Sequence, residues 1–395
     1  MEYDFDQVTD RKGTDCVKWD RMKRIYPENP DALPFWVADM DFVCPRPITD
    51  AVQKRAGHLI YGYTEECENA GELVAGWMRR RHGWNIRPEW VAYHNGVIPI
   101  LTAMMLALTE PGDQVVIQPP VYYPFAETIA GNGRVAAENP LLFDGSRWVM
   151  DYEGLEKLAE NPAVKMLFLC NPHNPVSRAY TEEELRRLGK ICLRHRIWIV
   201  SDEIHSDLVY PGNRHVPIAS LSRELAEITV TASSFSKTFN TAGLQMAMAI
   251  IPSEKLRNAY RKEMERTSFY VNLFGSVALK AAYENPECEE YLSQLLVYLW
   301  DNYQYVDTYL RTYMPKIRCQ RPEATYLLWL DCCQLQMSPQ ELESFFLKRA
   351  GIAFDFGPVF GTGGEGYVRL NIACPRRLLQ QCLERMRAAC EQAGL

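Results

Sequence analysis

The sequence predicts an α/β protein, with a mainly parallel sheet in a large domain and a smaller α+β domain beside it. From about residue 90 to residue 250, short β-branched runs alternate with longer helical segments, which is typical of a parallel sheet covered by helices. After residue 253 the pattern changes to a long charged stretch and then to fewer, mixed elements. With 395 residues, of which 47% are hydrophobic, the chain is long enough for both domains.

The predicted strands of the large domain are short, apolar and rich in β-branched residues, which suits burial on both faces. They are Gln114 to Gln118, Val164 to Cys170, Ile197 to Ser201, Ile228 to Ala232 and Gln245 to Ile251. Between two of these strands, Thr181 and Glu184 have the spacing of a capping box, and apolar residues follow at helical intervals. A helix is therefore expected to begin there.

The remaining segments predict a second domain that is discontinuous in sequence. They are a helix over Glu254 to Arg266, strands over Thr325 to Leu330 and Tyr367 to Ile372, and helices over Pro339 to Arg349 and from Pro375. The proline-rich residues 27–47 favour an extended arm between the domains. We expect residues 46–280 to form the large domain, and residues 1–45 with 281–395 to form the arm and the small domain.

Charge and hydropathy argue against several classes of protein. A net charge of −7 and a pI near 5.7 do not suit a nucleic-acid surface, which needs clustered Lys and Arg. The longest mainly apolar stretch, Val97 to Leu108, is shorter than the roughly 20 residues that cross a bilayer. The acidic start is unlike a secretory signal, so we expect a cytoplasmic protein without a membrane span. Twelve cysteines without CxxC pairs favour free thiols and no metal site.

The most informative segment is TASSFSKTFNTAGL, residues 231–244, which follows a predicted buried strand. It places Lys237 among hydroxyl groups with no acidic neighbour. The hydroxyls of Ser234 and Ser236 beside an ammonium group suit a phosphate ester. A serine-rich loop with a solvated lysine is the alternative.

Polar residues also follow other strands, at the edge where open α/β sheets present ligand-contacting groups. Asp202 ends one strand, and a carboxylate there could keep a pyridine nitrogen protonated; a helix N-cap is the alternative. His205, three residues on, is a candidate contact or a structural histidine. Asn174 lies in the turn Asn-Pro-His-Asn-Pro, from which its amide could bond a phenolic oxygen, although alone this is only a turn.

Three further positions are candidates for ligand binding. Gly96 precedes the apolar helix that starts at Val97, and its backbone would let a phosphate approach the free N–H groups, although many helices start this way. Tyr122 and Tyr123 follow a strand, so one ring could lie flat against a pyridine, although aromatic pairs are more often core. Arg369, in an otherwise apolar strand, needs an anion, either a substrate carboxylate or a structural partner.

Together these residues resemble the site of the fold-type I pyridoxal-phosphate (PLP) enzymes, in the class I and II aminotransferase family. The resemblance covers nearly the whole chain, from Lys18-Trp-Asp to Arg369. The segments WVADMDF (36–42) and YGYT (61–64) look like the carbon–sulfur β-lyase branch, which includes cystathionine β-lyases of the MalY/PatB type and cystalysin. This resemblance implies the aspartate aminotransferase-like fold, with a mainly parallel seven-stranded sheet.

The resemblance also implies a role for each candidate residue. Lys237 would form the Schiff base and shuttle protons, with Tyr123 beside the substrate. Pyridoxal 5′-phosphate would be bound by Gly96, Val97, Tyr122, Asn174, Asp202, His205, Ser234, Ser236 and Lys237. Tyr63 would reach the phosphate of the neighbouring subunit in a homodimer. Arg369 would bind the carboxylate of an amino-acid substrate, and Ala38 would also contact the substrate.

Two departures from the family pattern bear on activity. Many aminotransferases of this fold have an arginine eight residues after the lysine, whereas this chain has Gln245, which favours a lyase over a transaminase. Val176 and Ser177 stand where the family usually has Thr-Gly, and they could reshape the turn that carries Asn174. Two alternative functions remain open, namely an aminotransferase and a PLP-binding regulator.

Overall fold

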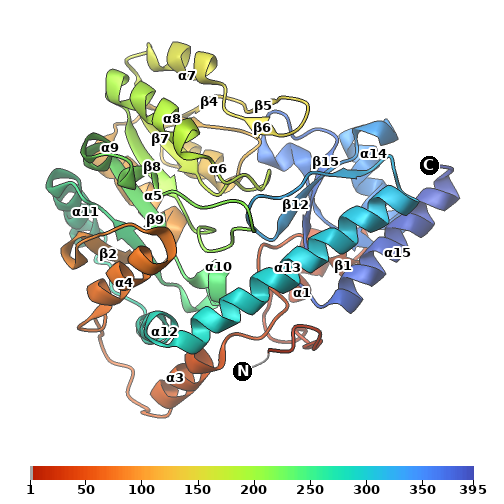
Figure 1. The fold of residues 1–395 in the computed structure, drawn as a ribbon, viewed down its shortest axis with the longest axis horizontal. Coiled ribbons are helices and arrows are strands. Elements are labelled where there is room, and N and C mark those ends of the chain that lie inside the picture. The colour runs from red at the N-terminus through yellow and green to blue at the C-terminus, as the bar shows by residue number, and fades with distance from the viewer. Residues whose placement is uncertain (1–2) are drawn as a thin grey trace.

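The computed structural model describes residues 3–395, and within them the largest sheet has seven strands (Figure 1). In spatial order they are β2 (Val91–His94), β10 (Ala247–Ile250), β9 (Thr229–Ser233), β8 (Trp198–Asp202), β7 (Val164–Cys170), β3 (Gln114–Ile117) and β4 (Val135–Glu138). The strands from β9 to β4 run parallel, and β10 runs antiparallel to both of its neighbours. The predicted fold class is confirmed.

Helices cover both faces of this sheet. Successive side chains of a strand point to opposite faces, so neighbouring residues of one strand pack against different helices. In β7, Phe168 packs in the same apolar cluster as α5 (Val97–Leu108), α6 (Pro124–Gly131) and α11 (Glu254–Arg266). Its neighbour Leu167 packs on the other side, with α7 (Tyr152–Ala159) and α8 (Glu182–His195). The sheet is thus buried on both sides.

The predicted capping box is present at the start of α8. The side chain of Thr181 accepts a hydrogen bond from the backbone of Glu184, whose carboxylate accepts one from Thr181. The helix ends at Arg196, which adopts the left-handed conformation with φ 59°. Since these signals are local, the sequence alone predicts this helix.

The C-terminal part contains a second, four-stranded sheet packed with long helices (Figure 1). Its strands are β11 (Arg318–Cys319), β12 (Leu327–Asp331), β15 (Tyr367–Asn371) and β14 (Asp355–Phe356). Its helices are α13 (Pro286–Tyr313), α14 (Pro339–Ser344), the π-helix Phe345–Ala350 and α15 (Arg376–Ala393). The long helix α13 and the strands β2 and β4 are absent from the sequence-based expectations. Both strands have four residues, and they lie at the two edges of the sheet.

The proline-rich arm lies against this C-terminal part. Its strand β1 (Leu33–Pro34) pairs in parallel with β13 (Ile352–Ala353). The predicted domain boundaries stay a prediction. The other elements are α1 (Val17–Asp20), α2 (Met22–Ile25), α3 (Arg46–Ala56), α4 (Ala70–His82), β5 (Leu142–Phe143), β6 (Trp148–Val149), α9 (Arg223–Ile228), α10 (Ser236–Phe239), α12 (Leu273–Glu284) and short 3₁₀ turns.

Three further observations concern the chain as a whole. Over residues 3–395, no helix combines the length and the apolar character that a membrane span requires. In the same part of the chain, no group of three or more His, Cys, Asp or Glu side chains is arranged to hold a metal ion. All twelve cysteines are free thiols.

Candidate active site

A cavity of about 220 Å³ lies at the carboxyl ends of the parallel strands β7 and β8, next to the first turns of α5 and α10. Ten residues predicted from the sequence line it: Ala38, Gly96, Val97, Tyr122, Asn174, Asp202, His205, Ser234, Ser236 and Lys237. The fold therefore brings together residues as far as 199 positions apart in the sequence. This location is the edge where α/β sheets bind ligands.

Lys237 lies on the short helix α10 and points into the cavity. Its Nζ donates a hydrogen bond to the carbonyl of Ala38, which also accepts one from the hydroxyl of Tyr326 at 2.9 Å. Asn240 on the same segment fixes the arm that carries Ala38, since its side chain bonds the backbone of Met40 with distances of 3.0 and 2.8 Å. Burial lowers the pKa of Lys237 to about 8, so a larger share of this amine is neutral near physiological pH than for a solvated lysine.

Asp202 ends β8 at the floor of the cavity. Its Oδ1 accepts a hydrogen bond from the backbone of Ile204 at 3.1 Å, and a turn rather than a helix follows the strand. The helix N-cap alternative is therefore wrong. Burial raises the pKa of Asp202 to about 7, and the positive charge of Lys237 opposes this shift. A cationic group in the cavity would keep the carboxylate ionised.

The cavity lining also includes donors that suit a phosphate site. Gly96 is the N-cap of α5, so the first backbone N–H groups of this helix face outward without helical partners. The hydroxyls of Ser234 and Ser236 lie 2.9 Å apart, and the backbone N–H of Ser236 donates to Ser234 Oγ at 3.0 Å. Helix N-terminus and hydroxyls together suit a dianionic phosphate.

The unusual residues Val176 and Ser177 help to close the turn that carries Asn174. Ser177, with φ 58°, adopts the left-handed conformation that glycine would favour, and its backbone N–H donates to His173 O at 2.8 Å. Its hydroxyl donates to the carbonyl of Leu327. Val176 is buried. The departure from the family pattern therefore leaves Asn174 in the cavity wall.

Arg369 lies behind Asn174 and is almost fully buried. Its Nη1 donates to Asn174 Oδ1 at 2.9 Å, its Nη2 donates to the carbonyl of Trp36 at 2.7 Å, and it forms a salt bridge with Asp355. The ring of Phe360 lies 5.0 Å from the guanidinium. The anion that pairs with Arg369 in this structure is thus the side chain of Asp355. Arg369 contacts the cavity wall through Asn174.

Comparison with known proteins places the chain in a family. The family model described as aminotransferase class I and II matches residues 39–386. The chain belongs to the class I and II aminotransferase family. It is 42% identical over 386 residues to cystathionine beta-lyase PatB of Bacillus subtilis (strain 168), which covers 98% of this chain and 99% of that relative. Protein MalY of Escherichia coli (strain K12) is 32% identical over 383 residues, with 96% of each chain covered.

A solved structure agrees with this assignment. Cystalysin from Treponema denticola, whose crystal structure contains a pyridoxal 5′-phosphate cofactor, is 35% identical and covers 100% of both chains with a TM-score of 0.96. The predicted resemblance to the class I and II aminotransferases, and to their PatB and MalY branch, is confirmed.

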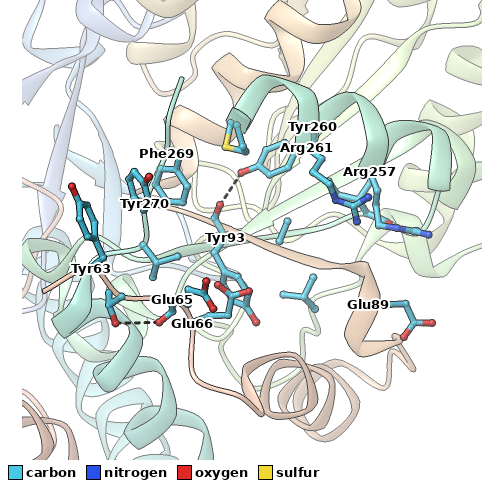
Figure 2. A pocket seen from close by; sticks show the side chains of 16 residues that line it. Tyr63, Glu65, Glu66, Glu89, Tyr93, Arg257, Tyr260, Arg261, Phe269 and Tyr270 are labelled. Carbon is cyan, nitrogen blue, oxygen red and sulfur yellow. Dashed lines mark hydrogen bonds between the residues drawn. The ribbon is translucent and has the colours of Figure 1, made fainter. Parts of the chain in front are cut away.

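Besides Arg369, two residues to which the family resemblance gives a role do not line the cavity. Tyr63 has a 94% exposed side chain, and its ring lies 5.4 Å from that of Tyr270 beside a separate, open cavity of about 810 Å³ (Figure 2). Tyr123 is the N-cap of α6, with its ring 5.5 Å from that of Tyr122. His205 lies inside, where burial holds its pKa well below the usual range and the imidazole is neutral.

Sequence reasoning missed three residues that line the cavity or contact residues of the candidate site. Cys170 lines the cavity, pairs in register with Asp202, and its sulfur accepts a hydrogen bond from the backbone of Asn174 at 3.4 Å. Its place at the end of a predicted strand was the available signal. Tyr326 and Asp355 gave no such signal, because Tyr326 contacts Ala38 from 288 positions away and Asp355 meets Arg369 only through the pairing of β14 with β15.

Proposed function

We propose that this protein is a PLP-dependent carbon–sulfur β-lyase. Its substrates would be L-cystathionine or related L-cysteine thioethers, and its products a thiol, pyruvate and ammonia. The observation that carries this proposal is one cavity in which Lys237, Asp202 and the serine hydroxyls converge. The 42% identity to a cystathionine beta-lyase over nearly the whole chain supports the lyase reaction in particular.

The cofactor of this chain is pyridoxal 5′-phosphate, and the donors of the cavity fit its functional groups. We assign the phosphate to the N-terminus of α5 with Ser234 and Ser236, the ring nitrogen to Asp202 and the phenolic oxygen to Asn174. The lysine amine is the nucleophile that an aldehyde requires. When bound, the cofactor supplies an electron sink for the charge released at the substrate α-carbon.

Lys237 moves the protons in the proposed reaction. Its pKa of about 8 leaves a useful fraction of neutral amine near pH 7.5, so Nζ can remove the α-proton as a general base. The bond between the β-carbon and sulfur then breaks, and the thiolate takes a proton from Lys237 or Tyr123. The released aminoacrylate hydrolyses to pyruvate and ammonia. Arg369 would hold the substrate carboxylate and so orient the α-proton toward Nζ.

An aminotransferase is the alternative function, and the two differ after the first proton transfer. A transaminase returns that proton to the cofactor and releases a keto acid that keeps its β-substituent. In this chain Gln245 takes the place of the arginine that many aminotransferases use as a phosphate clamp, and its side chain is exposed rather than in the cavity. This favours elimination.

Adding L-cystathionine to the purified protein separates the two functions. We expect stoichiometric pyruvate and free thiol, with the absorbance of the bound cofactor retained through turnover. Release of a keto acid without thiol, together with conversion of the cofactor to its amine form, would make the protein an aminotransferase. Absence of any cofactor absorbance after incubation with PLP would contradict both functions.

We also propose that the enzyme is a homodimer in which Tyr63 completes the phosphate site of the partner. Leu59, Ile60, Tyr63 and Tyr270 are exposed apolar side chains. The rings of Tyr63 and Tyr270 lie side by side on neighbouring segments (Figure 2). Such a patch on a free subunit would be covered in a complex. Sedimentation should give about twice the 45.5 kDa of one chain. A fully active monomer would contradict the proposal.

A further inference from the structure

Asp355 is a buried carboxylate at the guanidinium that the proposed function assigns to the substrate. It lies on β14 directly opposite Arg369 on β15, and the two side chains form a salt bridge. Both are buried, and burial raises the pKa of Asp355. Loss of either partner would leave an uncompensated charge in a desolvated place. The proposed reaction does not use Asp355, so its presence at this position needs another explanation.

The hydrogen bonds of Arg369 show which N–H donors of its guanidinium Asp355 occupies. A guanidinium has five N–H donors. Nη1 donates to Asn174, and Nη2 donates both to the carbonyl of Trp36 and to Asp355. Nε is buried and has no hydrogen-bond partner in the described part of the chain. Both N–H groups of Nη2 are therefore occupied before any ligand arrives.

Bidentate binding of a second carboxylate conflicts with this arrangement. A carboxylate binds a guanidinium along the edge of Nε and Nη2 or along the edge of Nη1 and Nη2, so each edge requires Nη2. The carbonyl of Trp36 is held by the backbone, whereas the side chain of Asp355 can rotate away. Two carboxylates on one buried guanidinium would also repel each other. An incoming carboxylate must therefore replace Asp355.

We propose that Asp355 is a specificity-determining residue that holds Arg369 until the carboxylate of an amino acid replaces it. The inference rests on the proposed function in one respect, since Arg369 must be the group that receives the carboxylate. An amino acid has two anchors, because its amine reacts at the cofactor and its carboxylate binds Arg369. A carboxylate without an amine has only one anchor and does not displace Asp355. Asp355 thus excludes simple carboxylates, among them the product pyruvate.

The variant Asp355→Asn tests this proposal, because it keeps the shape of the side chain and removes its charge. We expect the cofactor-loaded variant to bind pyruvate on the order of tenfold more tightly than the wild type, as measured by calorimetry. Ethylamine, which has an amine and no carboxylate, should bind both proteins equally, as followed by the absorbance of the cofactor. Asp355→Ser is a second variant with the same expected direction. Glu263→Gln, at another buried carboxylate, is the matched control and should leave both affinities unchanged.

The direction in which the pyruvate affinity changes distinguishes this role from a structural one. If Asp355 only held Arg369 in place, the variants would bind pyruvate more weakly than the wild type, and the proposal would be wrong. Wild-type protein that binds pyruvate as tightly as L-alanine would overturn it without any variant. Tight pyruvate binding that survives Arg369→Gln in the Asp355→Asn background would remove Arg369 from its proposed role. A failed elimination assay beside the expected pyruvate affinities would contradict the lyase function alone.

Discussion

Replacing Lys237 by alanine is expected to lower the rate of elimination by at least about 10³-fold, since one side chain provides both the nucleophile and the general base. The variant should also lose the absorbance band of the lysine-bound cofactor. The phosphate donors at Gly96, Ser234 and Ser236 remain, so cofactor can still bind without a covalent bond. The measurement is pyruvate release from L-cystathionine, with the visible spectrum recorded on the same sample.

Lys262→Ala is the matched control for this variant. Lys262 lies exposed on α11, away from the residues that line the cavity, so its loss should change neither rate nor spectrum. Thermal unfolding of the Lys237→Ala protein will show whether it folds. A folded Lys237→Ala protein with a normal elimination rate would refute the assignment of Lys237 and the reaction built on it.

Replacing Asp202 by asparagine is expected to lower kcat by about 10²-fold or more, which is typical for the loss of one group that stabilises developing charge in a buried site. Asparagine keeps the size of the side chain and can still accept the bond from Ile204. It lacks the negative charge that would hold a proton on the ring nitrogen, so the carbanion would lose its electron sink. Steady-state pyruvate release gives kcat for both proteins.

Asp202→Glu distinguishes a charge effect from a packing effect. The glutamate restores the carboxylate at a shifted position, so we expect it to recover part of the rate that asparagine loses. Glu203→Gln is the control, because this neighbouring carboxylate bonds Ser201 and His215 and does not line the cavity. An Asp202→Asn enzyme with unchanged kcat would show that the carboxylate does not serve the reaction.

Both expectations follow from the way the sheet positions its functional groups. Parallel strands end at the same edge, so residues that follow different strands meet there although they are far apart in sequence. Asp202 and Cys170 are adjacent in register across β8 and β7. Lys237 comes from the segment after β9, which pairs with β8. The cavity thus has one rigid side that the strands fix and one side that the N-terminal arm closes through Ala38.

Local sequence signals were sufficient for the inner strands of the large sheet and for three of its helices. The limits of the apolar run at β7 and of the helices α5 and α11 agree residue for residue with the structure. The capping box at Thr181 also predicted the start of α8. The edge strands β2 and β4 could not be predicted in this way, because their residues are only partly buried and lack the continuous apolar run of the inner strands.

The sequence by itself determined the fold class and the family, and it named ten of the residues that line the cavity, because weak local signals occur together in an order that resembles one family. Only the tertiary structure decided what Arg369 binds and where Tyr63 lies. Asp355 meets Arg369 across two paired strands, and Trp36 reaches it from 333 positions away. Such contacts depend on how distant segments pack, and no local pattern of residues encodes them.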